Sequence, residues 1–425
     1  MILTTNNFEY HPIKLEIMNL LCSYSKDLYN FSLYKIRQHF FKTNSYLSYN
    51  DNYKLVKNSL NEFDEKPYYK LPTNVSQQTL KAVDYSFKSF LSLLKQKNSG
   101  KYNKKIKLPG YLDKNGKYRV IFTKIHMRFV NNLVRLTLPK EIKDNYKFKS
   151  LDFKIPKHID KDEIQEIHII PIGKSFKVSW IRKSDNDIEY LHSDNIMSID
   201  LGINNLATIL ISNSQPIIID GKKAKSVNSR FNYKIAKLKS QIDRTKNNNK
   251  NYSQLSLSLC KTFSNRNNFM KNFIHKTATK IVDIAFKQQI NTIIVGYNKE
   301  WKTEVNLGRK NNKIFYGIPH STLIDYITYK AKTMGIKVIL QEEAYTSKCD
   351  ALAFETIEKQ DKYLGKRIKR GLFQSSTGKL INADVNAAIN ILSKYLNKYK
   401  QDSYLIVNKI LSKGFVFNPV RLRLI

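Results

Sequence analysis

The sequence has few cysteines. Cys22, Cys260 and Cys349 are the only three in 425 residues, and they are widely spaced and odd in number. This pattern excludes a disulfide framework and a paired CxxC zinc site, and it indicates a reducing compartment. A chain of this length can bury a large core without such cross-links, and it suits two or three domains.

Long hydrophobic runs are also missing. The apolar stretches, such as residues 293–295 and 338–340, are far shorter than the roughly 20 residues that a membrane-spanning helix needs. The N-terminal segment MILTTNNFEY has no basic stretch followed by an apolar one, so no secretory signal is predicted. We therefore expect a protein of the prokaryotic cytoplasm, associated with the nucleoid and not with a membrane.

Acidic residues are scarce compared with basic ones. Lys and Arg number 73 against 35 Asp and Glu, which gives a formal net charge of +38. The high content of Lys, Asn, Ile and Tyr is typical of an AT-rich genome, but mutational bias does not remove an excess of this size. Because such a charge repels itself in a compact fold, the expected partner is a polyanion, and nucleic acid is preferred.

The first 194 residues are predicted to form one domain. Apolar residues recur with a 3.6-residue period in residues 80–94, which indicates an amphipathic helix, and residues 15–40 are also helical in pattern. Turn signals and alternating apolar residues between 101 and 180 favour strands. The pattern predicts a β-barrel or sheet with a helical insert at about residues 15–100.

Residues 195–425 are predicted to form a second, α/β domain. Three strands (196–200, 206–211 and 216–220) are followed by helices that alternate with strands at 292–296 and 336–340, which is typical of an α/β nuclease core. Two segments fit this core poorly. A basic helical segment at 222–290 and an irregular one at 345–380 are interpreted as inserts that touch nucleic acid, although a charge run can equally be a solvated face.

Four carboxylates stand at element ends in this second domain. Asp200 ends a strand just before Gly202, Glu342 and Glu343 follow another strand, and Asp384 opens a helix. Each has an ordinary explanation, in a turn, in loop solvation or as a helix N-cap. Together they can converge on one edge of a sheet, where their mutual repulsion calls for cations. Mg²⁺ or Mn²⁺ fits such ligands, and two ions about 4 Å apart can hydrolyse a phosphodiester.

Three strings resemble the three RuvC motifs of the TnpB/OrfB family: SIDLGINNLATI (198–209), IPHSTLIDYITYKAKTMGIKVILQEEAYTSKCDALAFE (318–355) and YLGKRIKRGLFQSSTGKLINADVNAAINIL (363–392). The string LPTNVSQQTLKAVD, which leads into a basic KLPGY segment, is similar to the N-terminal region of the family. The resemblance implies an RNase H-like RuvC nuclease domain preceded by a wedge-type β-barrel with a helical recognition insert. It also implies a guide RNA, a target-adjacent motif and cleavage of double-stranded DNA.

The resemblance assigns roles to the acids. Asp200 matches the first catalytic aspartate and Asp384 the third acid, each as a ligand of two Mg²⁺ or Mn²⁺ ions. The second acid falls in the Glu342-Glu343 pair, where Glu343 is favoured because it precedes Thr346 by three residues, as in related E-x-x-T-S motifs. Many relatives carry paired CxxC zinc ligands between the second and third motifs. Only Cys349 lies there in this chain, so no zinc is expected and the segment should hold its shape by packing.

The predicted nucleic-acid contacts are basic or aromatic residues in three segments, since phosphate contact and base stacking need these side chains. They are Lys101, Lys104, Lys105, Lys107 and Tyr111, then Lys222, Lys223 and Arg230, and finally Lys366, Arg367, Lys369 and Arg370. Neither His275 nor His320 is assigned to the site, because hydrolysis with metal-bound carboxylates does not require histidine.

Three other interpretations stay open. A relative without cleavage activity would bind guided DNA targets and leave them intact, and a compact type V CRISPR effector would share the RuvC core. A transposase acting in strand transfer would give joined products and not simple breaks. The sequence also leaves open the guide RNA, the target-adjacent motif and the oligomeric state.

Overall fold

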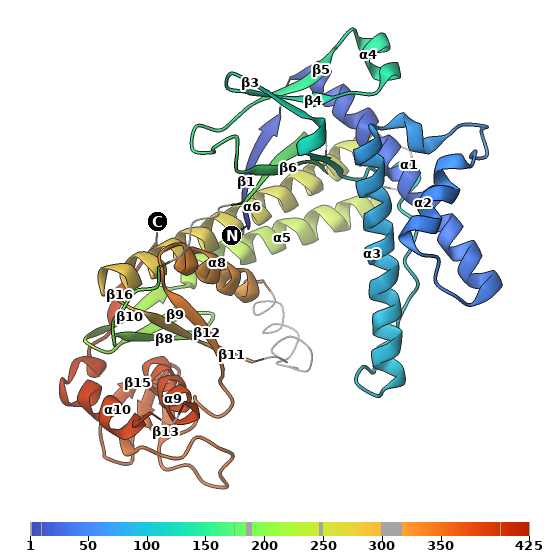
Figure 1. Ribbon diagram of the computed structural model, residues 1–425. Helices are drawn as coiled ribbons and strands as arrows, with labels where there is room; N and C mark the ends of the chain where they lie inside the picture. Colours follow the sequence, from blue (N-terminus) through green and yellow to red (C-terminus); the bar gives the residue numbers. More distant parts are fainter. Residues whose placement is uncertain are drawn as a thin grey trace. The chain divides into compact units, whose positions relative to one another are not determined.

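A computed structural model describes residues 2–9, 11–173, 175–183, 189–245, 250–298, 317–399 and 401–424. The chain divides into two compact units, Met1–Asn186 and Asp187–Ile425, and each is described by itself (Figure 1). The first unit holds the predicted 1–194 domain except for its last residues.

The helices of the first unit follow the predicted periodicity, and both predicted helices are longer than expected. They are α1 (Pro12–Thr43), α2 (Tyr49–Asn58), α3 (Thr73–Asn98) and α4 (Lys140–Tyr146), with short 3-10 turns η1 (Pro67–Lys70) and η2 (Lys124–His126). Rings of Phe40, Phe87 and Phe90 join α1 to α3, with centroids 5.4–6.2 Å apart. Such ring pairs add stability beyond the area they bury.

The strands of the first unit form two antiparallel sheets. Strands β1 (Ile2–Glu9), β7 (Ser175–Lys183), β6 (Ile164–Ile172) and β2 (Val120–Thr123) make one, in that order, and β3 (Met127–Val130), β4 (Leu133–Thr137) and β5 (Ser150–Lys154) make the other. Both sheets contribute to one core with α1, which includes Leu21, Phe122 and Trp180. The wedge-type barrel stays a prediction.

The second unit contains a six-stranded sheet. Its strands are β8 (Ile196–Leu201), β9 (Asn205–Ile211), β10 (Ser214–Asp220), β11 (Thr292–Tyr297), β12 (Lys337–Glu342) and β16 (Val420–Leu422). The order is β12-β11-β8-β9-β10-β16. Only β9 runs against the other strands, so β8, β10, β11 and β12 all finish at one end, which we name the carboxyl end of the sheet.

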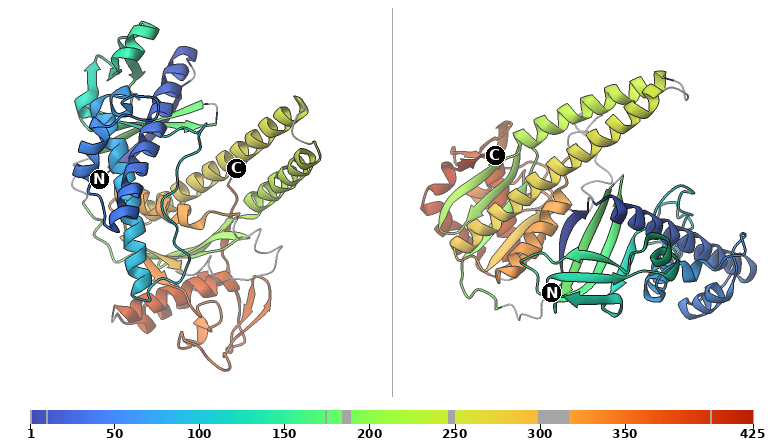
Figure 2. Two further views of the ribbon diagram at one scale, coloured as in Figure 1. Left: turned by 90° about the vertical axis from the view of Figure 1, so that its right-hand side faces the viewer. Right: turned by 90° about the horizontal axis from the view of Figure 1, so that it is seen from above.

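Helices cover both faces of this sheet (Figure 2). They are α5 (Lys222–Arg244), α6 (Lys250–Lys287), α8 (His320–Thr333), α9 (Ala383–Lys398) and α10 (Ser403–Ser412), with 3-10 turns η3 (Ala351–Ala353) and η4 (Phe415–Phe417). Side chains of β11 alternate between the faces, as the two-residue period of a strand requires. Ile293 packs with α6 and α8, and Ile294 packs with α9. In the described part of the chain, no helix is long and apolar enough to cross a membrane.

The segment between β12 and α9 carries a small antiparallel sheet of β13 (Lys366–Lys369), β14 (Leu372–Gln374) and β15 (Leu380–Asn382). The buried carboxylate of Asp350 organises it. Asp350 Oδ2 accepts hydrogen bonds from Ser375 Oγ at 2.8 Å and from the backbone N–H of Ser376 at 2.7 Å. Asn386 and Asn390 of α9 both donate to the carbonyl of Cys349, at 2.8 and 2.7 Å. Buried polar groups thus join this segment to α9.

Candidate active site

Two of the predicted acids lie at the carboxyl end of the sheet, on strands in the same parallel group. Asp200 is the next-to-last residue of β8, and Glu343 directly follows β12. Strand β11 runs between them, and its Gly296 stands beside Asp200, because Val295 pairs with Ile199. A buried parallel sheet therefore brings together residues that are more than 140 positions apart in the sequence.

Gly296 allows this approach. A Cβ atom at position 296 would lie 2.6 Å from Glu343 Oε2 and 2.6 Å from Ile391 Cδ1, so both side chains would have to move away. The absent side chain lets the carboxyl group of Glu343 lie across the end of β11. Glu343 Oε2 is buried there and has no hydrogen-bond partner in the described structure. An acceptor oxygen left in this state is costly and is suited to a cation.

The third acid, Asp384, is the second residue of α9. It is not the N-cap, because Asn382 fills that position and accepts from the N–H groups of Asp384 and Val385 at 3.0 and 3.3 Å. The side chain of Asp384 is therefore available to other groups. Its Oδ2 accepts from Asn205 Nδ2 at 2.6 Å, and its Oδ1 accepts from Arg367 at 3.1 Å.

Three hydrogen bonds between distant segments hold these elements in register. Ser198 Oγ donates to the carbonyl of Ala388 at 2.7 Å and joins β8 to α9. The guanidinium of Arg421, on β16, donates to Asn205 Oδ1 at 2.9 Å. Buried His320 Nε2 lies 2.9 Å from the carbonyl oxygen of Gly202 in the loop after Asp200. His320 was not assigned to the site from the sequence. It contacts the loop between Asp200 and Asn205, and the amide of Asn205 donates to Asp384.

The electrostatics of the acids reflect this crowding. Burial raises the pKa of Asp200 well above its ordinary value, the negative charges of Asp384 and Glu343 raise it further, and Arg367 opposes them. Burial, followed by the charge of Glu342, raises the pKa of Glu343 to about 7, and Lys394 opposes that rise. A carboxyl group shifted in this way is poised to exchange its proton for a cation.

Glu342 is placed differently from its neighbour. Its side chain is 56% exposed and forms an ion pair with Lys394 of α9. Its charge raises the pKa of Glu343, but it is not among the charges that raise the pKa of Asp200. The geometry favours Glu343 as the second acid of the site.

The fit of this group to metal ions has two sides. The donors are hard carboxylate oxygens, which Mg²⁺ and Mn²⁺ prefer, and Glu343 Oε2 is an unpartnered one. Yet no three His, Cys, Asp or Glu side chains among the described residues already stand close enough to enclose an ion, because Asp384 directs its oxygens to Asn205 and Arg367. The carboxylate oxygens are therefore suitable ligands for Mg²⁺ or Mn²⁺. The three side chains would have to move closer together to bind an ion.

The first segment of predicted nucleic-acid contacts lies in the first unit, after α3. Residues 101–119 form neither helix nor strand, so the chain after α3 enters a strand only at β2. Ile106 and Leu108 pack against the α1 and α3 cluster. The lysines near them, Lys101, Lys104, Lys105 and Lys107, are exposed. Tyr111 is 48% exposed, and the guanidinium of Arg37 stands 4.8 Å above its ring.

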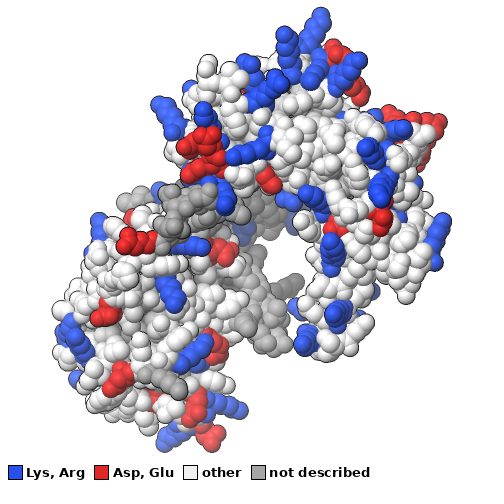
Figure 3. Space-filling model, in the orientation of Figure 1, with Lys and Arg blue, Asp and Glu red and all other residues white. Residues whose placement is uncertain are grey.

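The other predicted contacts lie in the second unit. Lys222, Lys223 and Arg230 are exposed on α5, and Lys366, Arg367, Lys369 and Arg370 are exposed on and beside β13. Among all these contacts, only Arg367 reaches the three acids, through Asp384. On the face that Figure 3 shows, Lys and Arg are spread over both units and do not form a single patch.

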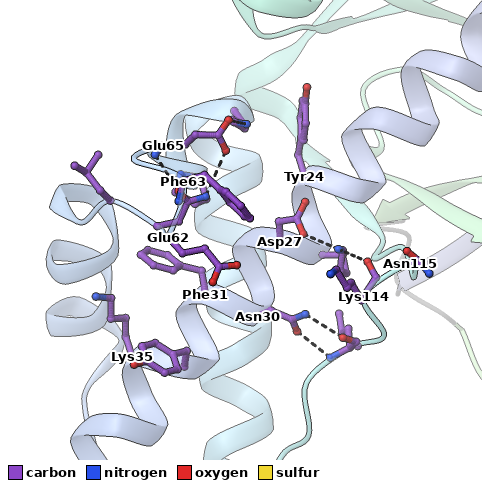
Figure 4. A pocket seen from close by; sticks show the side chains of 17 residues that line it. Tyr24, Asp27, Asn30, Phe31, Lys35, Glu62, Phe63, Glu65, Lys114 and Asn115 are labelled. Carbon is purple, nitrogen blue, oxygen red and sulfur yellow. Dashed lines mark hydrogen bonds and ion pairs between the residues drawn. The ribbon is translucent and has the colours of Figure 1, made fainter.

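A large cavity lies in the first unit and holds none of these acids. It has a volume of about 970 Å³ and lies between α1, residues 60–70 and residues 112–115 (Figure 4). Its lining mixes charges, with ion pairs of 2.6 Å joining Lys26 to Asp27 and Lys70 to Glu65. Phe63 beside it is 72% exposed. The mixed charges distinguish it from the purely basic segments above.

Parts of the chain match two protein-family models, and most of the chain is similar to a viral protein. The family model OrfB_IS605, described as a probable transposase, matches residues 183–302, and the Cas12f1-like TNB domain model matches residues 320–391. The chain is 26% identical over 415 residues to "TnpB-like protein ORF457" of Acidianus two-tailed virus, which covers 91% of this chain and 86% of that protein.

Among solved structures, the chain is similar to the protein in "Cryo-EM structure of the Cas12f1-sgRNA-target DNA complex". The TM-score is 0.57 at 16% identity, over 90% of this chain and 83% of that one. A second likeness, to "Structure of the mini-RNA-guided endonuclease CRISPR-Cas_phi3", has a TM-score of 0.41 at 11% identity, over 92% and 91% of the two chains, which is too low to carry an argument.

These likenesses define a protein with a TnpB/Cas12-like fold. The two family models match residues up to 391 of the second unit, with a gap between 302 and 320, and the viral relative covers both units. The two family models and the viral relative support the TnpB/OrfB family of TnpB-type nucleases as the family that this chain resembles.

Proposed function

We propose that this chain is an RNA-guided DNA endonuclease that hydrolyses DNA phosphodiester bonds at Asp200, Glu343 and Asp384, with two Mg²⁺ or Mn²⁺ ions as cofactors. A guide RNA pairs with the target, and a target-adjacent motif licenses cleavage of double-stranded DNA. The second unit is then a RuvC-like nuclease domain. The first, with its helical insert, is a wedge and recognition module.

One observation carries the proposal. Three carboxylates from β8, the end of β12 and the start of α9 are close enough for Asp384 and Glu343 to raise the pKa of Asp200. Uncompensated burial of several carboxyl groups destabilises a fold, so a cluster of this kind is typical of a site that receives cations. The strand order, with only the second strand of the domain reversed, also suits an RNase H-like fold.

Each residue has a distinct part in this site. Two such ions, when bound, activate a water and stabilise the leaving oxygen in phosphodiester hydrolysis. Asp200 and Glu343 supply buried anionic oxygens from the two sides of Gly296. Asn205 orients the carboxylate of Asp384 through a 2.6 Å hydrogen bond. Arg367, 46% exposed, presents a cation that matches the charge of a phosphate next to the acids.

The guide RNA accounts for the net charge of +38. A protein that holds an RNA scaffold and an RNA–DNA heteroduplex contacts phosphates and A-form shape, while base pairing reads the sequence. The exposed lysines between Lys101 and Lys107 and those on β13 suit such sequence-independent contacts. These segments have few acids to cancel the attraction.

The test begins with co-expression of the chain and its flanking genomic DNA. The co-purifying RNA is sequenced, and the complex is incubated with a matching plasmid in Mg²⁺, with the Asp200→Ala protein as the control. Guided breaks that require both Mg²⁺ and Asp200 are expected. Tight guided binding without breaks would make the chain a guided DNA-binding protein, and joined products would make it a transposase. The origin of the RNA separates a transposon end from a CRISPR array.

The choice of second acid has its own test. Glu343→Gln is expected to lower the rate of Mg²⁺-dependent cleavage at least about 100-fold, because it removes a ligand charge beside Asp200. Glu342→Gln removes only an exposed ion pair with Lys394 and is expected to change the rate less than about threefold, since such pairs are weak. The rates are compared under single-turnover conditions. The reverse order of the two effects would move the site to Glu342.

A further inference from the structure

Helix α5 leaves the sheet beside the proposed catalytic group. Strand β10 runs parallel to β8, so its last residue, Asp220, lies at the carboxyl end of the sheet. The first turn of α5 is joined to the loop before β9, because Gly221 N–H donates to the carbonyl of Asn204 at 2.8 Å and Lys225 Nζ donates to Asn204 Oδ1 at 3.0 Å. The next residue, Asn205, holds Asp384.

Beyond this first turn, α5 and the first half of α6 project away from the core. Ala224 is the only residue of α5 in the core cluster of the sheet, and α6 enters that cluster only from Met270 onward. Between these points the two helices pack on each other, with Arg266 Nε donating to Asn228 Oδ1 at 2.8 Å. Figures 1 and 2 show them leaving the sheet side by side. The pair begins at the end of the sheet where the acids lie.

One face of α5 carries a row of five cations, which we name the α5 row: Lys223, Arg230, Lys234, Lys237 and Arg244. Their spacings of 7, 4, 3 and 7 residues keep them on one side of a helix with 3.6 residues per turn. All five are exposed, and none forms an ion pair with another described residue. At a rise of 1.5 Å per residue, the row is about 30 Å long.

The row has no acid to balance it. Asp243 is the sole acidic residue of α5, and it projects about 140° away from the centre of the row by helical geometry. Like charges three or four residues apart, such as Arg230, Lys234 and Lys237, destabilise a helix. A polyanion laid along the row would relieve this repulsion. Tyr233, 73% exposed beside the row, offers a ring for stacking against an unpaired base.

We propose that the α5 row is a track for the phosphate backbone of the single DNA strand that is delivered to Asp200, Glu343 and Asp384. The row begins beside the loop that holds Asp384 and runs outward, so a strand bound along it is aimed at the acids. The exposed tyrosine ring suits a single strand, whose bases are free to stack, better than a duplex. This inference rests on the proposed nuclease function and names the surface that delivers its substrate.

The test compares two variants with five substitutions each, both with Asp200→Ala so that no DNA is cut. The row variant changes Lys223, Arg230, Lys234, Lys237 and Arg244 to Gln. The control variant changes Lys280, Lys287, Lys332, Lys337 and Lys409 to Gln, which are equally exposed in the same unit. Glutamine keeps the helix propensity of the helical positions, and Lys337 is an exposed residue at the start of β12, so both proteins are expected to fold, as circular dichroism can verify.

The measurement is the affinity of the full chain, with its co-purified RNA, for a labelled single-stranded DNA of unrelated sequence at several salt concentrations. The row variant is expected to bind at least tenfold more weakly than the control at about 100 mM salt. Its slope of log affinity against log salt should fall by about 3, since each phosphate contact to a single strand contributes about 0.7. The measurement needs no cleavage of DNA. A negative result for the α5 row can therefore be distinguished from a failure of the nuclease proposal.

Two outcomes would overturn the proposal. If the row and control variants lose affinity and slope equally, the row is an ordinary solvated face. If the row variant alone loses its co-purifying RNA, the row holds the guide and not the substrate strand.

Discussion

Asp200→Asn is expected to lower Mg²⁺-dependent DNA cleavage at least about 1,000-fold and, at the same time, to make the metal-free protein more stable. The loss of activity follows because the amide cannot supply the negative charge that a bound cation needs at the end of β8. The gain in stability follows because the wild-type carboxyl group is buried among like charges, Asp384 first and Glu343 second. Catalytic groups of this kind commonly trade stability for function.

The stability change should depend on pH. The pKa of Asp200 is raised in the folded protein, and that of Glu343 is raised to about 7, so the folded state keeps protons that the unfolded state has already released. The contribution of these two carboxyl groups to the stability of the metal-free wild type is therefore most favourable below about pH 4, where both states are protonated, and it falls as the pH rises through 7. Asp200→Asn removes the part of this loss that comes from Asp200. The free energy of unfolding of the variant should therefore exceed that of the wild type by an amount that grows with pH, to about 1–3 kcal/mol at pH 8.

Thermal unfolding in a chelator at pH 5 and pH 8 measures this difference, and a second series with Mg²⁺ measures the response to metal. The exposed Asp361, whose substitution Asp361→Asn removes one charge from the same unit, serves as the control. Mg²⁺ should stabilise the wild type and the control more than Asp200→Asn. If Asp200→Asn were less stable than the wild type at pH 8 without metal, the carboxyl group would be satisfied by the protein itself, and the metal site would be wrong.

The parts of the fold that the sequence predicted best are those with strong periodicity. The strands that became β8, β9, β10 and β11 were predicted to within a residue or two, because continuous apolar runs bounded by turn residues are typical of buried strands. Helix α3 was found from its apolar stripe. Asp200 and the Glu342-Glu343 pair were singled out because acids at strand ends can converge on one edge of a sheet, and the resemblance favoured Glu343 within the pair.

Other features of the site depend on long-range contacts that no local pattern encodes. Gly296 matters because the Glu343 carboxyl group crosses β11, Asn205 because it meets Asp384, and His320 because its ring reaches Gly202. In the sequence these are a glycine in a strand, an asparagine in a turn and a histidine at a helix start. The asparagine and the histidine lie within strings that were recognised for other reasons, and their partners appear only in three dimensions.

The small sheet between β12 and α9 was not predicted as strands, since β13, β14 and β15 are three or four residues long and β13 is fully exposed. Its order comes from a buried polar network that has no periodicity. Asp350 accepts hydrogen bonds from Ser375, from Ser376 and, through its other oxygen, from the N–H of Leu352 at 3.1 Å. The single Cys349 beside it is buried, with a pKa that burial raises, which suits a structural thiol better than a reactive one.

Asp350→Ala is therefore expected to unfold the segment of residues 345–382 locally, at a cost of about 3–5 kcal/mol, because it leaves several buried donors without an acceptor. Asp350→Asn keeps one acceptor oxygen and should cost less. Hydrogen–deuterium exchange measures the loss of protection in β14 and β15, and exchange in β8 and β11 serves as the internal control. A zinc chelator should leave the protection of the wild type unchanged, whereas loss of protection on chelation would show that a metal and not this network holds the segment.

The same variant should also affect cleavage, because β13 carries Arg367, the partner of Asp384. If Asp350 acts only by holding this segment, Asp350→Ala should reduce cleavage no further when Arg367→Ala is already present. The two single losses would then not add, as is usual for residues that act through one contact. Additive losses would instead mean that the segment contributes to the site through groups other than Arg367, such as Lys366 or Lys369 on the same strand.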